Sequence, residues 1–183
     1  MKTALRKLNN RSGFTLAELL VTILILLMVS AVVAGGIPAA SNAYSKAVDA
    51  ANAQVLLSTA ATALRDELGT AQDVSVNGTA VSYYSADTGN FSTLSLAELD
   101  GRSTVQLTTY AGVEVDGETI GSDGNAVSWP LVSSATITKK LSLSYESVSY
   151  EKGLITFGGL TVSKGNTTLA SLDELIINVI SAT

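Results

Sequence analysis

The chain has 183 residues, with 11 Lys and Arg against 16 Asp and Glu, and a formal net charge of −5. It contains no cysteine and no histidine, which excludes disulfides, thiolate metal sites, thiol nucleophiles and histidine-based catalysis. Hydrophobic residues make up 46% of the chain and charged residues 15%, which excludes a disordered chain. Composition therefore disfavours most enzyme classes and leaves one modest domain with an appendage.

The charges are distributed unevenly along the chain. Residues 1–13 carry four basic residues and no acid, whereas residues 14–183 carry seven basic and 16 acidic residues. From Leu19 to Ala40 there are 22 residues without a charged side chain, and about 20 apolar residues suffice to cross a bilayer core. The apolar region of a secretory signal is shorter, about 7–15 residues. Because basic flanks stay in the cytoplasm, we expect a single span with the N-terminus inside and the body outside.

Glu18 lies near the start of this apolar segment. A carboxylate at the centre of a bilayer helix costs about 2.5–3.5 kcal/mol, and less near the interface. The next basic residue along the chain is Lys46, roughly 40 Å further on if the segment is helical. An acid within a membrane is a functional hypothesis by default, and the partner of Glu18 must be a new charge or another molecule.

Residues 11–20, RSGFTLAELL, resemble the processing site of type IV prepilins. The resemblance covers residues 6–68 and implies that a prepilin peptidase cuts between Gly13 and Phe14, after which Phe14 is N-methylated. It also implies that Glu18 is the assembly residue. The partners it implies are other pilin subunits in a homo- or hetero-oligomer, the peptidase, an inner-membrane assembly platform and membrane lipid. Many Gram-negative pilins close the head with a disulfide, so a chain without cysteine fits a Gram-positive pilin or a pseudopilin better.

The chemistry of such a cut agrees with the position of Glu18. The nitrogen of Phe14 is a neutral amide before cleavage and an ammonium afterwards, at the edge of the apolar segment. A buried acid and a buried ammonium each incur a large desolvation cost, which pairing offsets in part. An ammonium of one subunit that meets Glu18 of its neighbour would fix the axial register between them. Cleavage also removes the four leader cations, which resist passage through the bilayer.

Beyond the span, apolar spacings of three and four predict an amphipathic helix over residues 41–68, followed by Gly69 as a C-cap. The expected apolar stripe consists of Tyr44, Val48, Ala51, Val55, Leu57, Ala61, Leu64 and Leu68. Gly35, Gly36 and Pro38 are expected to break the long helix, because a proline inside a helix costs roughly 3 kcal/mol. The break is either a plain kink or a locally melted segment, and the resemblance implies unwinding on filament assembly.

Residues 70–183 predict a β-rich domain. A hairpin is expected around Asn77-Gly78, and further strands are expected over 141–150, 153–157, 160–162 and 175–180, with a turn at Lys152-Gly153. Residues 84–138 are less periodic and are expected to form a connection with a short helix at Ser95–Asp100. The predicted fold class is α+β: a long N-terminal transmembrane helix continues into an amphipathic helix packed on one antiparallel sheet.

Four oxygen-bearing side chains lie within ten residues, and Ca²⁺ uses such ligands: Asp116, Glu118, Asp123 and Asn125. Their spacing does not match an EF-hand loop, and the glycines among them also indicate turns, so an ordinary turn is the favoured interpretation. We expect no cofactor and no catalytic residue. No nucleic-acid partner is expected, because residues 70–183 carry 5 basic and 12 acidic residues.

Three functional hypotheses follow. The first is a structural subunit of a type IV pilus or pilus-like filament, with a leader at 1–13, a transmembrane and assembly helix at 14–40 and an extracytoplasmic head at 41–183. Such a subunit is a single-pass protein of the cytoplasmic membrane before assembly and part of an extracellular or cell-surface filament afterwards. The second is a pseudopilin of a type II secretion or competence system. The third is a membrane-anchored extracellular binding domain that never assembles.

Overall fold

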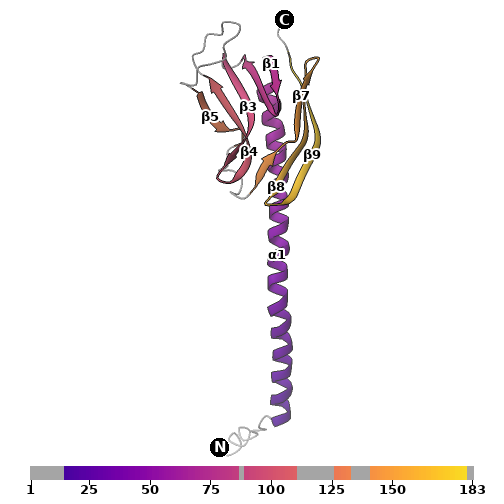
Figure 1. Cartoon of the computed structure of the whole chain (residues 1–183). Helices are drawn as coiled ribbons and strands as arrows, with labels where there is room; N and C mark the ends of the chain where they lie inside the picture. Colours follow the sequence, from indigo (N-terminus) through magenta and orange to yellow (C-terminus); the bar gives the residue numbers. More distant parts are fainter. Residues whose placement is uncertain (1–14, 87–88, 111–125, 133–140, 181–183) are drawn as a thin grey trace, which may run out of the picture. The chain divides into compact units, whose positions relative to one another are not determined.

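The computed structural model describes residues 15–86, 89–110, 126–132 and 141–180. Gly13, Phe14 and the rest of the predicted leader lie outside the described residues, as do the calcium candidates Asp116, Glu118, Asp123 and Asn125. The described residues form a long apolar N-terminal helix followed by antiparallel β-structure, which confirms the α+β class (Figure 1). The chain divides into two compact units, 1–46 and 47–183, with the boundary inside the helix.

Helix α1 runs without interruption from Leu16 to Leu68 and contains Pro38. The expected melting at Gly35, Gly36 and Pro38 is therefore wrong for this form of the chain. A proline removes one backbone donor, but the helical hydrogen bonds on either side are cooperative and hold the segment together. In apolar surroundings an opened turn would also leave several backbone groups without partners.

The strands form two antiparallel sheets rather than the single sheet expected. Strands β1 (Ala71–Asn77), β2 (Ala80–Ser85), β3 (Asn90–Leu99), β4 (Arg102–Tyr110) and β5 (Ala126–Pro130) form the first sheet in that order. Strands β6 (Ser142–Ser144), β7 (Ser147–Glu151), β8 (Leu154–Lys164) and β9 (Thr167–Asn178) form the second, in which β8 pairs with the other three. Figure 1 shows the two sheets flanking the C-terminal part of α1.

Two predicted turns are confirmed, and the prediction for the middle of the domain is wrong. The hairpin at Asn77-Gly78 joins β1 to β2, and the turn at Lys152-Gly153 joins β7 to β8. The expected helix at Ser95–Asp100 is instead the end of β3, which pairs residue by residue with β4 as far as Leu99. Asp100 and Gly101 then make the tight turn with φ of 53° and 72°.

The core lies between the C-terminal part of α1 and the two sheets. On α1 the buried residues are Ala53, Leu56, Leu57, Ala60, Ala61, Leu64 and Leu68. The second half of the predicted stripe is thus confirmed, but its first half is wrong: Tyr44 is 73% exposed and Val55 54% exposed. Two alanines, Ala53 and Ala60, are fully buried in the face that packs on the sheets. Small side chains admit close approach of strands, whereas hydropathy alone favours the larger residues on the neighbouring face.

Polar contacts attach α1 to the strands at both ends of this core. Lys164 on β8 forms an ion pair with Asp49 on α1. The buried hydroxyl of Tyr83 donates to Glu67 Oε1 at 2.7 Å. The amide of Ile180 donates to the carbonyl of Gly69 at 2.9 Å, directly after the helix end. The helix is therefore held to the sheets by specific bonds as well as by apolar packing.

Gly159 is required by two separate constraints. Its φ is +65°, and a Cβ built there would lie 2.7 Å from Glu146 Cγ. Gly165 offers a control, because its φ is +59° and nothing lies within 4 Å of a Cβ built there. We predict that Gly159→Ala lowers the free energy of unfolding by more than Gly165→Ala, since both strain the backbone but only the former must also turn the exposed Glu146 side chain aside. Urea unfolding of the purified protein, followed by Trp129 fluorescence, measures both; equal losses would contradict the account.

Two buried tyrosines make the domain sensitive to alkali. Burial raises the pKa of Tyr83 far above its usual range, and its hydrogen bond to Glu67 raises the pKa further. Burial also raises the pKa of Tyr145 to about 12. The native state therefore holds these phenolic protons more tightly than the unfolded chain, whose tyrosines titrate near 10. The resulting stability is fully present below about pH 10 and is lost as pH rises toward the native pKa values.

We predict cooperative unfolding between about pH 10 and 12, with each buried phenol costing up to about 1.4 kcal/mol per pH unit above 10. Tyr83→Phe should flatten this pH dependence, because one titrating group is gone, although Glu67 then loses its donor. Tyr44→Phe, at a position that is 73% exposed, should leave the pH dependence unchanged. Circular dichroism during a base titration measures the curves, and identical curves for all three proteins would contradict the prediction.

Candidate functional site

The first turn of α1 is built around Thr15 and Glu18. Glu18 Oε2 accepts hydrogen bonds from both the amide and the hydroxyl of Thr15, each at 2.9 Å. In return, the amide of Glu18 donates to Thr15 Oγ1 at 3.3 Å. This reciprocal pattern is a capping box, in which an N-cap hydroxyl and a carboxylate three residues later satisfy each other's free amides. The local sequence Thr-x-x-Glu thus determines where the helix begins.

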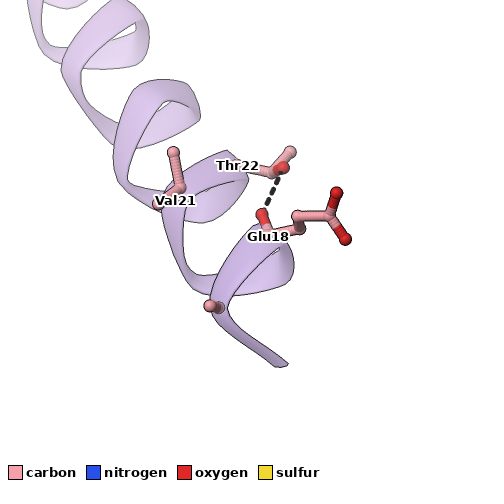
Figure 2. A pocket seen from close by; sticks show the side chains of 4 residues that line it. Glu18, Val21 and Thr22 are labelled. Carbon is pink, nitrogen blue, oxygen red and sulfur yellow. Dashed lines mark hydrogen bonds between the residues drawn. The ribbon is translucent and has the colours of Figure 1, made fainter. Parts of the chain in front are cut away.

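The other polar side chains of the apolar segment bond within the helix. Thr22 Oγ1 donates to the carbonyl of Glu18 at 2.7 Å, as Figure 2 shows, and Ser30 Oγ donates to the carbonyl of Leu26 at 2.8 Å. These bonds remove two hydroxyl donors from the helix surface, where lipid or another apolar helix would offer no acceptor. Glu18 is the remaining strongly polar group of this segment among the described residues.

Glu18 retains acceptor capacity beyond the capping box. Figure 2 shows its carboxylate directed away from the helix, on the same side as Thr22. Within the described residues its second oxygen, Oε1, has no hydrogen-bond partner. The geometry therefore leaves one carboxylate oxygen available to a donor from outside this helix, such as an ammonium.

The helix surface next to Glu18 is apolar and uncovered. Fourteen large apolar side chains between Leu16 and Ile37 are 50% to 84% exposed, and they occupy all sides of the helix. A helix that is apolar all round is stable only in a membrane or among other apolar elements. Among the described residues α1 is the helix that has the length and apolarity to cross a membrane. Gly35 and Gly36 belong to the same open surface, with no atom within 4 Å of a Cβ built at either.

A family model described as the prokaryotic N-terminal methylation motif matches residues 8–34, which include Gly13, Phe14, Glu18 and the first part of the apolar helix. This match supports a prepilin of the type IV pilin or pseudopilin kind, and with the apolar helix it indicates membrane anchoring. No curated protein matches the chain. No solved structure matches it.

The structure adds one residue to the predicted site: Thr15, the hydrogen-bond partner of Glu18. Glu18 was predicted from the sequence and Thr15 was not, although the Thr-x-x-Glu spacing of a capping box is visible in the sequence. Gly35, Gly36 and Pro38 lie in α1 within the same unit as Glu18, and no contact joins them to it. The described residues contain no group of acids that could hold a metal ion, and the calcium candidates lie outside them.

We predict that Thr15→Ala frays the first turn of α1. Loss of an N-cap hydroxyl costs about 1 kcal/mol, which corresponds to roughly fivefold faster exchange of amides in that turn. The Leu19 amide, bonded to the Thr15 carbonyl at 3.2 Å, is the reporter. Hydrogen exchange of the full chain in detergent micelles measures the effect. Thr15→Ser should retain protection, and so should Thr22→Ala, because Thr22 bonds one turn further along; loss of protection in Thr22→Ala alone would contradict the assignment.

Proposed function

We propose that this chain is a structural subunit of a type IV pilus or pilus-like filament. It is held in the cytoplasmic membrane through α1, cleaved between Gly13 and Phe14 by a prepilin peptidase, methylated at Phe14, and assembled on an inner-membrane platform with other pilin subunits. The observation that carries the proposal is the methylation motif over residues 8–34, which overlaps the first part of α1, where large apolar side chains are 50% to 84% exposed.

The geometry of Glu18 supports the assembly step. After cleavage the ammonium of Phe14 needs an anion in apolar surroundings, and Glu18 Oε1, at the start of α1, accepts no hydrogen bond from any of the described residues. An ion pair between the ammonium of one subunit and Glu18 of its neighbour would offset the loss of hydration of both charged groups. The apolar side chains beyond it would then exchange lipid contacts for contacts with neighbouring helices.

A pseudopilin of a secretion or competence system uses the same processing and the same helix. The absence of cysteine is compatible with this alternative, because the domain is held by its core and not by a disulfide. Long surface filaments distinguish a pilus subunit from a pseudopilin. A third possibility, an anchored domain that never assembles, predicts surface display that is independent of Glu18.

The proposal predicts a mature chain that begins at Phe14 and carries one additional methyl group. Glu18→Gln should still be cleaved, because the bond between Gly13 and Phe14 is intact, but filament yield should fall at least ~100-fold, since a buried ammonium is left without its anion. Mass spectrometry of the N-terminal peptide and electron microscopy of sheared cell surfaces measure the two effects.

Thr22→Val is the matched control, one helical turn from Glu18. It removes a polar group that bonds only within its own helix, so processing and filament yield should both be retained. A chain that keeps residues 1–13 in the membrane would overturn the proposal. Normal filaments from Glu18→Gln would remove the assembly role of Glu18 while leaving the processing intact.

A further inference from the structure

A short polar stretch of α1 lies between its apolar surface and its first bond to a strand. The dense series of exposed apolar side chains at the start of the helix ends at Ile37. Among the described residues, the first ion pair from α1 to a strand joins Asp49 to Lys164. Residues 41–46, with the sequence SNAYSK, lie between these limits and are exposed throughout. This stretch therefore contacts neither the core nor the strands.

Tyr44 and Lys46, which we name the outer pair, have no partner among the described residues. Tyr44 is 73% exposed, and Lys46 is exposed as well. Neither forms a hydrogen bond or an ion pair with a described residue, and Asp49, the nearest acid along the helix, is already paired with Lys164. The phenol and the ammonium are therefore available to a ligand outside the chain.

The distance along α1 from Glu18 to the outer pair matches the thickness of a lipid bilayer. Lys46 follows Glu18 by 28 residues, which corresponds to about 42 Å in a continuous helix. A bilayer is about 40–45 Å thick with its headgroup layers, and its hydrocarbon core is about 30 Å thick. When Glu18 lies in the headgroup layer on one side, the outer pair therefore lies in the headgroup layer on the other side.

A phospholipid headgroup offers the partners that these two side chains lack. Tyrosine is concentrated at membrane boundaries because its ring is apolar and its hydroxyl is polar. A phosphate oxygen accepts a hydrogen bond from a phenol and forms an ion pair with an ammonium, while the aliphatic stem of the lysine lies along the apolar surface. An acid would be repelled by the same phosphates, and the chain has no acid between Glu18 and Asp49.

We propose that the outer pair binds the phosphate groups of phospholipids in the outer leaflet and so fixes the depth at which α1 lies in the membrane. The hydroxyl of Tyr44 donates to a phosphate oxygen, and the ammonium of Lys46 forms an ion pair with a phosphate. The inference rests on the proposed function for the presence of α1 in a membrane, and it adds the lipid groups that hold the outer end of the span.

Single introduced cysteines locate the membrane boundary, because the chain has no other thiol. Ala40→Cys and Ala47→Cys lie on either side of Tyr44, about 10 Å apart along α1. The full chain is placed in phosphatidylglycerol vesicles, and the rate of reaction with a membrane-impermeant maleimide is compared with that of Thr167→Cys, at an exposed position of β9. Ala47→Cys should react about as fast as Thr167→Cys, and Ala40→Cys many times more slowly. A fast Ala40→Cys or a slow Ala47→Cys would place the boundary elsewhere and overturn the proposal.

Charge reversal of Lys46 tests the contact with phosphate. Lys46→Glu, in the Ala40→Cys background, places an anion among the phosphates, which should push the outer end of α1 out of the bilayer and raise the Ala40→Cys rate at least about fivefold. Lys46→Arg should leave the rate unchanged. Vesicles of digalactosyl diacylglycerol, a lipid without phosphate, are the matched control, and Lys46→Glu should have no effect there. Any effect of the glutamate on the neighbouring Asp49 is the same in both lipids. An unchanged rate in phosphatidylglycerol, or an equal rise in both lipids, would overturn the proposal.

The depth of position 44 is measured separately. Tyr44→Trp in the Trp129→Phe background leaves one tryptophan in the chain. Its fluorescence should be quenched more strongly by lipids brominated close to the headgroup than by lipids brominated near the ends of the acyl chains. Stronger quenching from the chain ends, or no quenching by either lipid, would contradict a place for Tyr44 at the headgroups.

The same vesicles distinguish lipid from a second copy of the chain, and this inference from the proposed function. Dilution with lipid separates copies but leaves each chain among its lipids, so the effect of Lys46→Glu should not depend on dilution. An effect that vanishes on dilution would identify a second copy as the partner and overturn the proposal. Ala40→Cys that reacts as fast as Thr167→Cys would mean that α1 does not enter the bilayer, which would count against the proposed function as well. A protected Ala40→Cys that does not respond to Lys46→Glu would count against this inference alone.

Discussion

The apolar surface of the first part of α1 is the constraint on which the rest of the molecule depends. A helix with apolar side chains on all sides has no stable place in water, and no other described element covers it. Its hydroxyls are therefore bonded back to its own carbonyls, and its one acid is drawn into the capping box. The C-terminal part of the same helix packs on the strands of the β-domain. There the buried residues are small or apolar and lie on one face of the helix, instead of on all sides. One helix thus has an exposed apolar surface in its first part and a face buried in a protein core in its last part.

The structure could be predicted from the sequence where the apolar residues are also the buried ones, and not where the two patterns differ. The N-terminal segment was predictable because charge, length and the position of Glu18 all lead to the same interpretation, and the later strands were predictable because they alternate cleanly. Strand β3 was obscured because its pattern is inverted at its start: Ser92 is 2% exposed and faces the core, whereas Phe91 lies on the side away from the core, beside Tyr84 of β2. The ring centroids of Tyr84 and Phe91 are 5.2 Å apart, and this contact stabilises the two rings on the side of the sheet away from the core. Hydropathy alone predicts that such aromatic residues face the core.

The candidate site shows the same division. Glu18 was selected because a lone acid in an apolar run is costly, and that argument needs no structure. The expectation of a melted segment at Gly35, Gly36 and Pro38 was wrong because the continuous helix of α1 overrides the low helix propensity of these three residues. The alternative of a plain kink stays a prediction.

The ion pair between Asp49 and Lys164 has a mechanical consequence. Asp49 precedes every buried residue of α1, and Lys164 lies at the end of β8 where the strand turns into β9. A tensile load that travels along α1 from its N-terminus meets this pair first, then the buried face from Ala53 to Leu68, and last the bond between Gly69 and Ile180. The pair is therefore the first contact with the β-domain to bear such a load, and its rupture would transfer the force, in shear along the helix, to the buried residues of α1.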